Sequence, residues 1–332
     1  MKKLFSLAVA FLTAITVMAQ MPENMMFSGI STTKVSTMEI TTPSDTVAFA
    51  MTGMTQGSLT LPAMKGMATI PSFTIHNITF SMSGGLVVTL PEQTFAATVT
   101  TDGGEKTIKG TSISGTYNIM ENAMDITAVF TYGNMPMPVT YHITAYYIKP
   151  VTNKVTVVVG GAYPYTNESV TYRIRQYKEE GETLLDVEIP QFSLSGTVMG
   201  DLTLGTYTVK GLRYDNERGG FFRDYRYDNL SFYFKAMQNG VVIMDKEYPF
   251  NTEKDNNILV KLSGTDVAEI VNTFQMGAMP FGIVSTFGGT ASGIGSIITD
   301  YRDSNKCYNL SGQRVSEHSK GIVIINGKKY LR

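Results

Sequence analysis

One stretch of the chain, LSFYFKAMQNGVVIMDKEY at residues 230–248, has the pattern of a β-hairpin. Leu230, Phe232 and Phe234 alternate with other residues, so in an extended strand they would share one face. Asn239 and Gly240 then separate two strand-like runs, and both residue types tolerate the positive φ angles of a type I′ turn. The stretch therefore predicts two antiparallel strands joined by a two-residue turn.

The same pattern recurs along the chain. FTIHNITFSMSGGLVVTL (residues 73–90) and TFAATVTTDGGEKTIKG (residues 94–110) each have two strand-like runs around a glycine-containing turn. One segment, TDVAEIVNTFQ (residues 265–275), has apolar residues at helical spacing, but an internal repeat in the sequence favours a strand there. We therefore predict an all-β fold.

The internal repeat points to a duplicated domain. Residues 70–80 (IPSFTIHNITF) align without gaps with residues 204–214 (LGTYTVKGLRY), and each apolar or aromatic position keeps its character. Three further pairs follow the same order: LTLP (59–62) with VEIP (187–190), Gly84-Gly85 with Gly219-Gly220, and GNMPMPVTYHI (133–143) with GAMPFGIVSTF (277–287). Residues 70 and 204 are 134 positions apart, which is far longer than a solenoid or propeller repeat. We therefore expect two domains, at residues 20–150 and 151–290, with a seam at residues 149–153.

The two repeats resemble the calycin-like β-barrel domains that occur in tandem in exported proteins of Gram-negative anaerobes. The resemblance is carried by the LTLP and VEIP segments, the aromatic-Thr-aliphatic strand after each, and the Met-Pro elements at residues 135–136 and 279–280. It implies two tandem antiparallel barrels of up-and-down topology, related in shape to lipocalins. Lipocalins carry a Trp near the start of the barrel, and this chain has no Trp, so lipocalin ligand chemistry is not transferred.

The first residues have the pattern of a secretory signal. Lys2 and Lys3 precede an apolar run at residues 4–17, and Ala19 and Gln20 flank the expected cleavage point. The run is shorter than the roughly 20 residues of a membrane span. We expect residues 1–19 to be removed, no transmembrane span in the mature chain, and export to the periplasm, the outer-membrane surface or the medium.

The last residues predict a linker and a small β-rich tail. Residues 291–300 continue a Gly- and Ser-rich stretch, and residues 301–332 follow it. YNLSGQRV (308–315) and GIVIINGKK (321–329) resemble the C-terminal elements of many exported proteins of such bacteria, which are related to the sorting tails of type IX secretion. This tail is shorter than a full sorting domain.

The residues that usually carry catalysis are scarce. Cys307 is the only cysteine, so no intramolecular disulfide can form, and the three histidines have no spacing typical of a metal site. Paired carboxylates such as Asp224 and Asp228 lie on charged strands, and no nucleophile motif such as GxSxG is present. We predict no enzymatic activity, no metal and no cofactor. The formal net charge of −1 gives no basic surface for nucleic acid.

The densest aromatic stretch is GGFFRDYRYDNLSFYF at residues 219–234. We predict as ligand-binding residues the aromatics and arginine of its first half: Phe221, Phe222, Arg223, Tyr225 and Tyr227. The simpler interpretation is a pair of amphipathic barrel strands with cross-strand aromatic packing.

Two functions remain open from the sequence. One is a binding module that holds a small apolar molecule in a barrel, or contacts a glycan or surface protein through the second barrel. The other is a surface structural or adhesive protein in which the barrels are spacers. A hollow apolar interior would favour the first, whereas filled cores and an exposed aromatic patch would favour the second.

Overall fold

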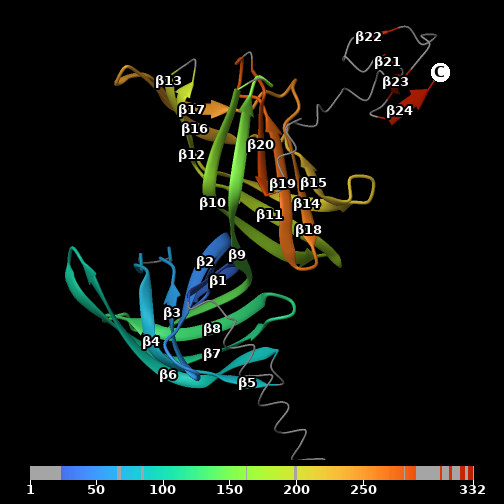
Figure 1. Cartoon of the computed structure of the whole chain (residues 1–332). Helices are drawn as coiled ribbons and strands as arrows, with labels where there is room; N and C mark the ends of the chain where they lie inside the picture. The colour runs from blue at the N-terminus through green and yellow to red at the C-terminus, as the bar shows by residue number, and fades with distance from the viewer. Residues whose placement is uncertain are drawn as a thin grey trace, which may run out of the picture. The chain divides into compact units, whose positions relative to one another are not determined.

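The computed structural model describes residues 24–65, 69–83, 86–161, 163–197, 200–279 and 281–288, together with four short strands between residues 307 and 331 (Figure 1). These residues contain β-strands and no α-helix, which confirms the all-β prediction. The chain divides into two compact units, residues 1–289 and residues 290–332. None of the described residues forms a helix with the length and apolarity of a membrane span.

The first barrel is an antiparallel meander in the spatial order β4-β3-β2-β1-β9-β8-β7-β6-β5. Its strands are β1 (Asn24–Val35), β2 (Met38–Met51), β3 (Gln56–Leu61), β4 (Phe73–Thr79), β5 (Ser81–Ser83), β6 (Val87–Thr101), β7 (Gly104–Asn118), β8 (Ala123–Tyr132) and the first part of β9 (Val139–Val159).

A side chain, rather than a backbone ladder, joins β4 to β6 where this meander closes. Gln93 lies between two register shifts in the β6–β7 pairing. Its Nε2 donates to the Thr79 carbonyl at 2.8 Å, and its Oε1 accepts from the Thr79 N–H at 2.9 Å. The amide of Gln93 thus takes the place of a backbone peptide group at this point of the barrel.

The second barrel is a closed antiparallel ring of eight strands. Its members are the last part of β9, β10 (Tyr163–Glu179), β11 (Glu182–Ile189), β14 (Tyr207–Asp215), β15 (Gly220–Asp224), β18 (Asn257–Ser263), β19 (Asp266–Phe274) and β20 (Ile283–Gly288). The ring closes because β9 pairs with both β10 and β20. The segment with helical spacing is strand β19, as the internal repeat predicted.

A four-stranded sheet accompanies this ring. It has the order β12-β13-β16-β17, with β12 at Phe192–Thr197, β13 at Gly200–Leu204, β16 at Ser231–Gln238 and β17 at Val241–Pro249. The turn between β16 and β17 has φ angles of 52° at Asn239 and 77° at Gly240. Two positive φ angles are those of a type I′ turn, so the hairpin predicted from residues 230–248 is confirmed.

One strand, β9, belongs to both barrels (Figure 1). Its first part pairs with β1 and β8, and its last part pairs with β10 and β20. The predicted seam at residues 149–153 lies inside this strand and not in a connecting loop. The buried residues nevertheless change there from one apolar cluster, which ends at Ala145, to a second, which begins at Val155.

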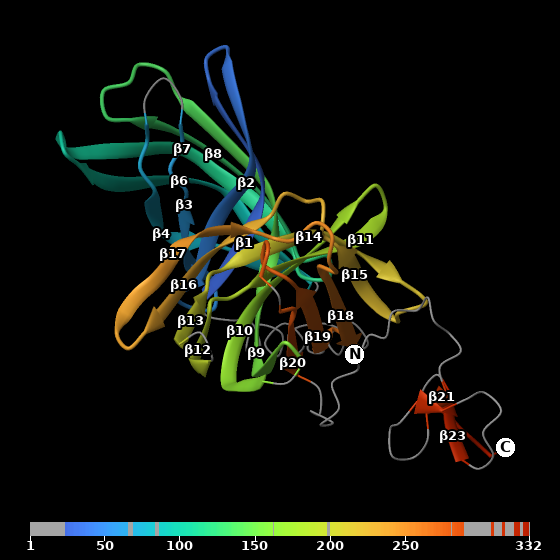
Figure 2. The same ribbon diagram turned by 90° about the horizontal axis from the view of Figure 1, so that it is seen from above.

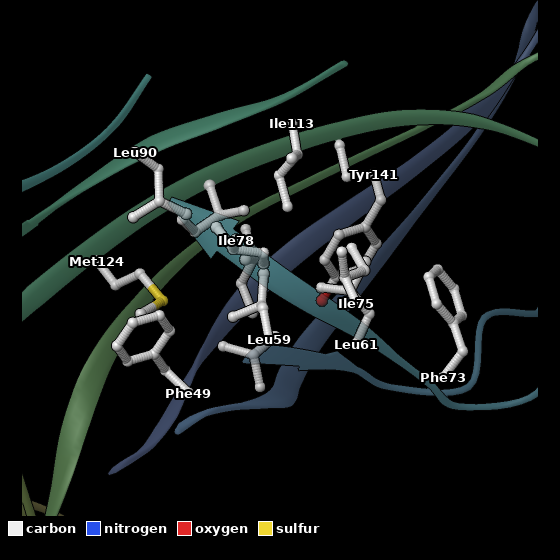
Figure 3. Packing of buried hydrophobic residues seen from close by; sticks show 14 of the residues in the cluster. Phe49, Leu59, Leu61, Phe73, Ile75, Ile78, Leu90, Ile113, Met124 and Tyr141 are labelled. Carbon is white, nitrogen blue, oxygen red and sulfur yellow. The ribbon is translucent and has the colours of Figure 1, made fainter. Parts of the chain in front are cut away.

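The core of the first barrel is formed by the inward side of each strand. Leu59 and Leu61 of β3 lie beside Ile75 and Ile78 of β4, and all four are almost fully buried (Figure 3). Leu59 and Leu61 follow the period-two pattern that the sequence shows, whereas Ile75 and Ile78 are three residues apart because the β3–β4 pairing shifts register between them, where Asn77 has a φ of 58°. Tyr141 of β9 is fully buried in the same core.

The described strands of the second unit, β21 (Cys307–Tyr308), β22 (Arg314–Val315), β23 (Ile322–Ile325) and β24 (Lys328–Leu331), form a small antiparallel sheet. The predicted signal, with Ala19 and Gln20, and the predicted linker lie outside the described residues.

Candidate functional site

The five predicted ligand-binding residues occupy two different environments. Phe221 and Tyr225 are only 7% and 1% exposed and belong to the core of the second barrel. Phe222 and Arg223 are half-buried, and Tyr227 is 73% exposed. The structure therefore brings Phe222, Arg223 and Tyr227 to the outer surface and places Phe221 and Tyr225 inside.

The interior around Tyr225 is a hydrogen-bonded aromatic cluster. The Tyr225 hydroxyl donates to Asn272 Oδ1 at 2.8 Å, and Asn272 Nδ2 donates to the Tyr207 hydroxyl at 2.7 Å. Burial raises the pKa of Tyr225 well above its usual value, so this phenol remains a neutral donor. The ring centroids of Tyr207 and Phe232 each lie 4.9 Å from that of Phe250. These rings fill the middle of the second barrel.

The arginines of the outer surface are paired with carboxylates. Arg223 donates to both oxygens of Asp228, at 3.0 and 2.8 Å, and these hydrogen bonds raise the pKa of Arg223. Burial would raise the pKa of Asp224, but hydrogen bonds and charge from Arg226 outweigh it and leave the pKa lowered. The surface is thus rich in charge and nearly balanced in sign.

Guanidinium groups also cover aromatic rings on this surface. The Arg218 guanidinium lies 4.1 Å from the centroid of the Phe222 ring, and that of Arg226 lies 5.7 Å from the Tyr227 ring. Cation–π contacts at exposed sites contribute about 0.5–1 kcal/mol each. Aromatic rings and guanidinium groups therefore lie next to each other on this surface.

Tyr214 is a further exposed aromatic residue of this barrel, and sequence reasoning missed it. It is 57% exposed and its ring packs edge-to-face on buried Phe221, with centroids 5.4 Å apart. In the internal repeat Tyr214 aligns with Phe80, which is 4% exposed. The repeat therefore suggested a core residue. We use the name outer aromatic surface for the exposed and half-exposed aromatics Tyr214, Phe222 and Tyr227 with their neighbouring arginines, although Tyr214, the register partner of Phe221, lies on the opposite face of the β14–β15 pair from Phe222.

A second exposed feature is the tip of the β16–β17 hairpin. Val241, Val242 and Ile243 are 64%, 45% and 49% exposed, and β17 is an edge strand of its sheet. The corresponding tip of the β6–β7 hairpin is polar, with Asp102 and Glu105. The sequence contains a sign of this exposure, because three successive β-branched residues follow Asn-Gly without alternating with polar residues, so they cannot all point to the core.

Two open grooves lie on the described surface. One, of about 440 Å³, is lined by Asn167, Ser169, Val170, Thr171, Arg173, Pro190, Gln191 and Ser193. The other, of about 630 Å³, is lined by Pro71, Ser72, Phe73, Thr74, His76, Ala96, Ala97, Thr98, Val99 and Thr100. Small and hydroxyl-bearing side chains predominate in both.

Within the described ranges, no cluster of three or more His, Cys, Asp or Glu side chains is arranged to hold a metal ion. His142 pairs with Asp125 at 3.2 Å, and the two side chains are 41% and 55% exposed. His76 lines the larger groove without an acidic residue among the other lining residues.

Comparison with known proteins identifies the class to which these barrels belong. A family model for the calycin-like β-barrel domain matches residues 20–143 and 152–290, so the chain belongs to this family. A search of curated proteins gave no match. One solved structure, from Bacteroides fragilis and provisionally described as an outer membrane protein, is similar over 84% of this chain and 99% of that chain, with 14% identity and a TM-score of 0.27.

Proposed function

We propose that the chain is a non-enzymatic, exported binding protein that contacts a surface ligand, a glycan or a protein, through the outer aromatic surface of its second barrel. The observation that carries this proposal is the contrast between the packed core of that barrel and its exposed tyrosines. Its interior is occupied by packed aromatic rings, whereas Tyr214 and Tyr227 are 57% and 73% exposed. Export is proposed from the signal pattern at residues 1–19.

The chemistry of the outer aromatic surface suits flat or ring-shaped partners. Exposed tyrosine rings offer an apolar face and a hydroxyl group, a combination common at binding hot spots. Because Arg223 and Arg226 are already paired with Asp228 and Asp224, the surface has little excess positive charge. This favours a neutral glycan or a mixed-charge protein surface over a polyanion.

The packed interior argues against the alternative of a small apolar ligand held inside the second barrel. A ligand there would have to displace rings such as Phe232 and Phe274, each no more than 2% exposed. The structural or adhesive role stays the second candidate, because filled barrels joined by one strand would also serve as spacers. A protein that acts only as a spacer would not need binding residues at Tyr214 or Tyr227.

The test is a binding screen with surface variants. Wild type and a Tyr214→Ala/Tyr227→Ala variant are compared on glycan arrays and on surface extracts. Met120→Ala is the matched control, because Met120 is 72% exposed on the first barrel. Loss of one hot-spot side chain typically costs about 2 kcal/mol or more, so we expect binding at least roughly 30-fold weaker. Binding that survives the double substitution would exclude this surface.

A further inference from the structure

The two barrels differ at one position, where two neighbouring strands diverge. In the first barrel β4 and β6 are bridged at Thr79 and Gln93 and then separate. The larger groove lies beyond this bridge, with Pro71–Thr74 and His76 on one side and Ala96–Thr100 on the other. We call this groove the wedge. Among the described strands, β6 has only β7 as a ladder partner over Phe95–Thr101.

The second barrel shows what occupies the same position there. The hairpin turns at residues 102–103 and 239–240 are equivalent, so Ala97–Thr100 of β6 correspond to Phe234–Met237 of β16. Those four residues of β16 pair with Asp201–Leu204 of β13. The strand edge that lines the wedge is therefore covered, in the second barrel, by the hairpin β12–β13.

The covering strand inserts alternate apolar side chains. Leu204 pairs with Phe234 and Leu202 with Ala236, and the two leucines are 2% and 5% exposed. The β3–β4 connection of the first barrel spans only residues 62–72, and its described part pairs with itself only at Met64 and Ile70, whereas the β11–β14 connection spans residues 190–206 and forms the longer hairpin β12–β13. The wedge is thus a site shaped for an added β-hairpin.

The same chain carries a hairpin of matching chemistry. The edge strand β17 begins with Val241, Val242 and Ile243, whose side chains are 64%, 45% and 49% exposed. The tip of this hairpin extends away from the closed ring (Figure 2). Edge strands with exposed apolar residues are templates for pairing with another chain unless a charge, a proline or a bulge protects them. In β17 the charges begin only at Asp245, and the pairing with β16 shifts register between Ala236 and Met237, so the uncharged edge is confined to the tip.

Neither surface carries a charge that insertion would bury. Residues 236–244, which form the hairpin tip, contain no Asp, Glu, Lys or Arg. The wedge lining contains none either. Since an unpaired charge moved out of water costs several kcal/mol, this neutrality removes the main obstacle to close contact.

We propose that the chain self-associates head to tail, with the β17 tip of one copy paired to the Ala97–Thr100 edge in the wedge of the next copy. The added strand would repeat, between molecules, the pairing that β13 makes with β16 within the second barrel. Because tip and wedge are different surfaces on different barrels, a dimer would still have one free tip and one free wedge, and the assembly would grow beyond the dimer as an open chain or a closed ring. This inference is independent of the outer aromatic surface.

The test uses two variants that each disable one surface of the full chain. Val242→Glu/Ile243→Glu charges the tip, and Ala96→Glu/Thr98→Glu charges the mouth of the wedge at two exposed positions. Met120→Glu is the control, being 72% exposed and outside both surfaces. Mass is followed by sedimentation velocity over a wide concentration range, and folding is checked by circular dichroism.

We expect wild type and the control to form species larger than dimers as concentration rises. Each surface variant should stay monomeric, and an equimolar mixture of the two should give a dimer and nothing larger, because one intact tip and one intact wedge remain. A monomeric wild type would overturn the proposal. So would a wedge variant that still associates, since this would indicate β17 pairing with β17.

A covalent trap keeps the test decisive if a charged variant misfolds. In a Cys307→Ser background, chains carrying Thr98→Cys are mixed with chains carrying Val242→Cys under mild oxidation. We expect a disulfide-linked heterodimer in yield at least tenfold above that from a mixture in which Met120→Cys replaces Val242→Cys. Equal yields from the two mixtures would contradict the proposed contact.

Discussion

Asp186 is the residue whose loss should destabilise the second barrel most clearly. Its Oδ2 accepts from Arg175 Nε at 3.0 Å and Nη2 at 2.5 Å, and its Oδ1 accepts from the Gly211 N–H at 2.9 Å. The Arg175 and Asp186 side chains are 17% and 6% exposed. Arg175 also donates to the Ser28 carbonyl of the first barrel at 3.1 Å. The pair is therefore buried and linked to both barrels.

Replacement of Asp186 by Ala leaves a buried guanidinium without its counter-ion and the Gly211 N–H without its acceptor. Removing one partner of a buried pair typically costs about 3–5 kcal/mol. We expect about 3 kcal/mol, at the low end, because Arg175 keeps its bond to Ser28 and its contact with the Tyr177 ring at 4.7 Å. In a domain of this size, such a loss lowers the thermal midpoint by roughly 6–12 °C.

The measurement is thermal and urea unfolding of the full chain followed by circular dichroism. Asp266→Ala is the matched control, because the Lys149–Asp266 pair has side chains that are 41% and 79% exposed and should contribute less than about 1 kcal/mol. Asp186→Leu combined with Arg175→Met should recover most of the loss, since no charge is then buried. The reasoning is refuted if Asp186→Ala costs less than about 1 kcal/mol, or if the double variant is no more stable than the single one.

Four further outcomes are expected. Gly29→Ala should cost about 1–3 kcal/mol, because its new Cβ would lie 2.0 Å from the Thr144 oxygen, whereas Gly53→Ala, with nothing within 4 Å, should be nearly neutral in the same unfolding assay. Burial raises the pKa of Tyr117 from 10 to about 12, so its contribution to stability should be complete below pH 10 and lost as the pH rises toward 12. Phenolate absorbance during alkaline titration checks this, and titration of every tyrosine near pH 10 in the folded protein would contradict it. Gln93→Ala should destabilise the first barrel by about 1–2 kcal/mol in urea unfolding, through its lost bonds to the Thr79 backbone. Mass analysis of exported protein should find Gln20 at its N-terminus, and a retained Met1 would refute the signal prediction.

Sequence patterns were sufficient to predict the strands and turns, but not which residues of the candidate site lie inside the barrel and which lie outside. The turn at Asn239 and Gly240 follows from residue chemistry that any strand pair would obey, and the structure has it. The repeat also decided correctly between helix and strand for residues 265–275, because its partner segment alternates in period two. These features depend on neighbours in sequence, which is why they could be predicted.

The exposure of the candidate site residues could not be predicted from the alternation of apolar and polar residues. Strand β15 ends at Asp224, so the direction of Tyr225 is set by the turn that follows and by its hydrogen bond to Asn272, far away in the chain. Phe222 and Tyr227 look similar to Phe221 and Tyr225 in the sequence, yet they lie outside. Tyr214 kept the aromatic character of Phe80 while changing from core to surface.

The β6 edge that lines the wedge has a register shift between Gln93 and Phe95 but no charge or proline beyond it. Residues 94–101 read TFAATVTT, without a charged residue or a proline, although residues 105 and 106 just beyond the turn are Glu and Lys. Charged residues, prolines and covering loops are the common means of preventing edge-to-edge pairing, and the second barrel uses a covering hairpin at the equivalent edge. A loop insertion costs little free energy, because loop-closure entropy grows slowly with length, so the first barrel could have gained the same cover easily. That no described strand pairs with this edge, and that it carries no charge, is a physical reason to expect a partner strand there.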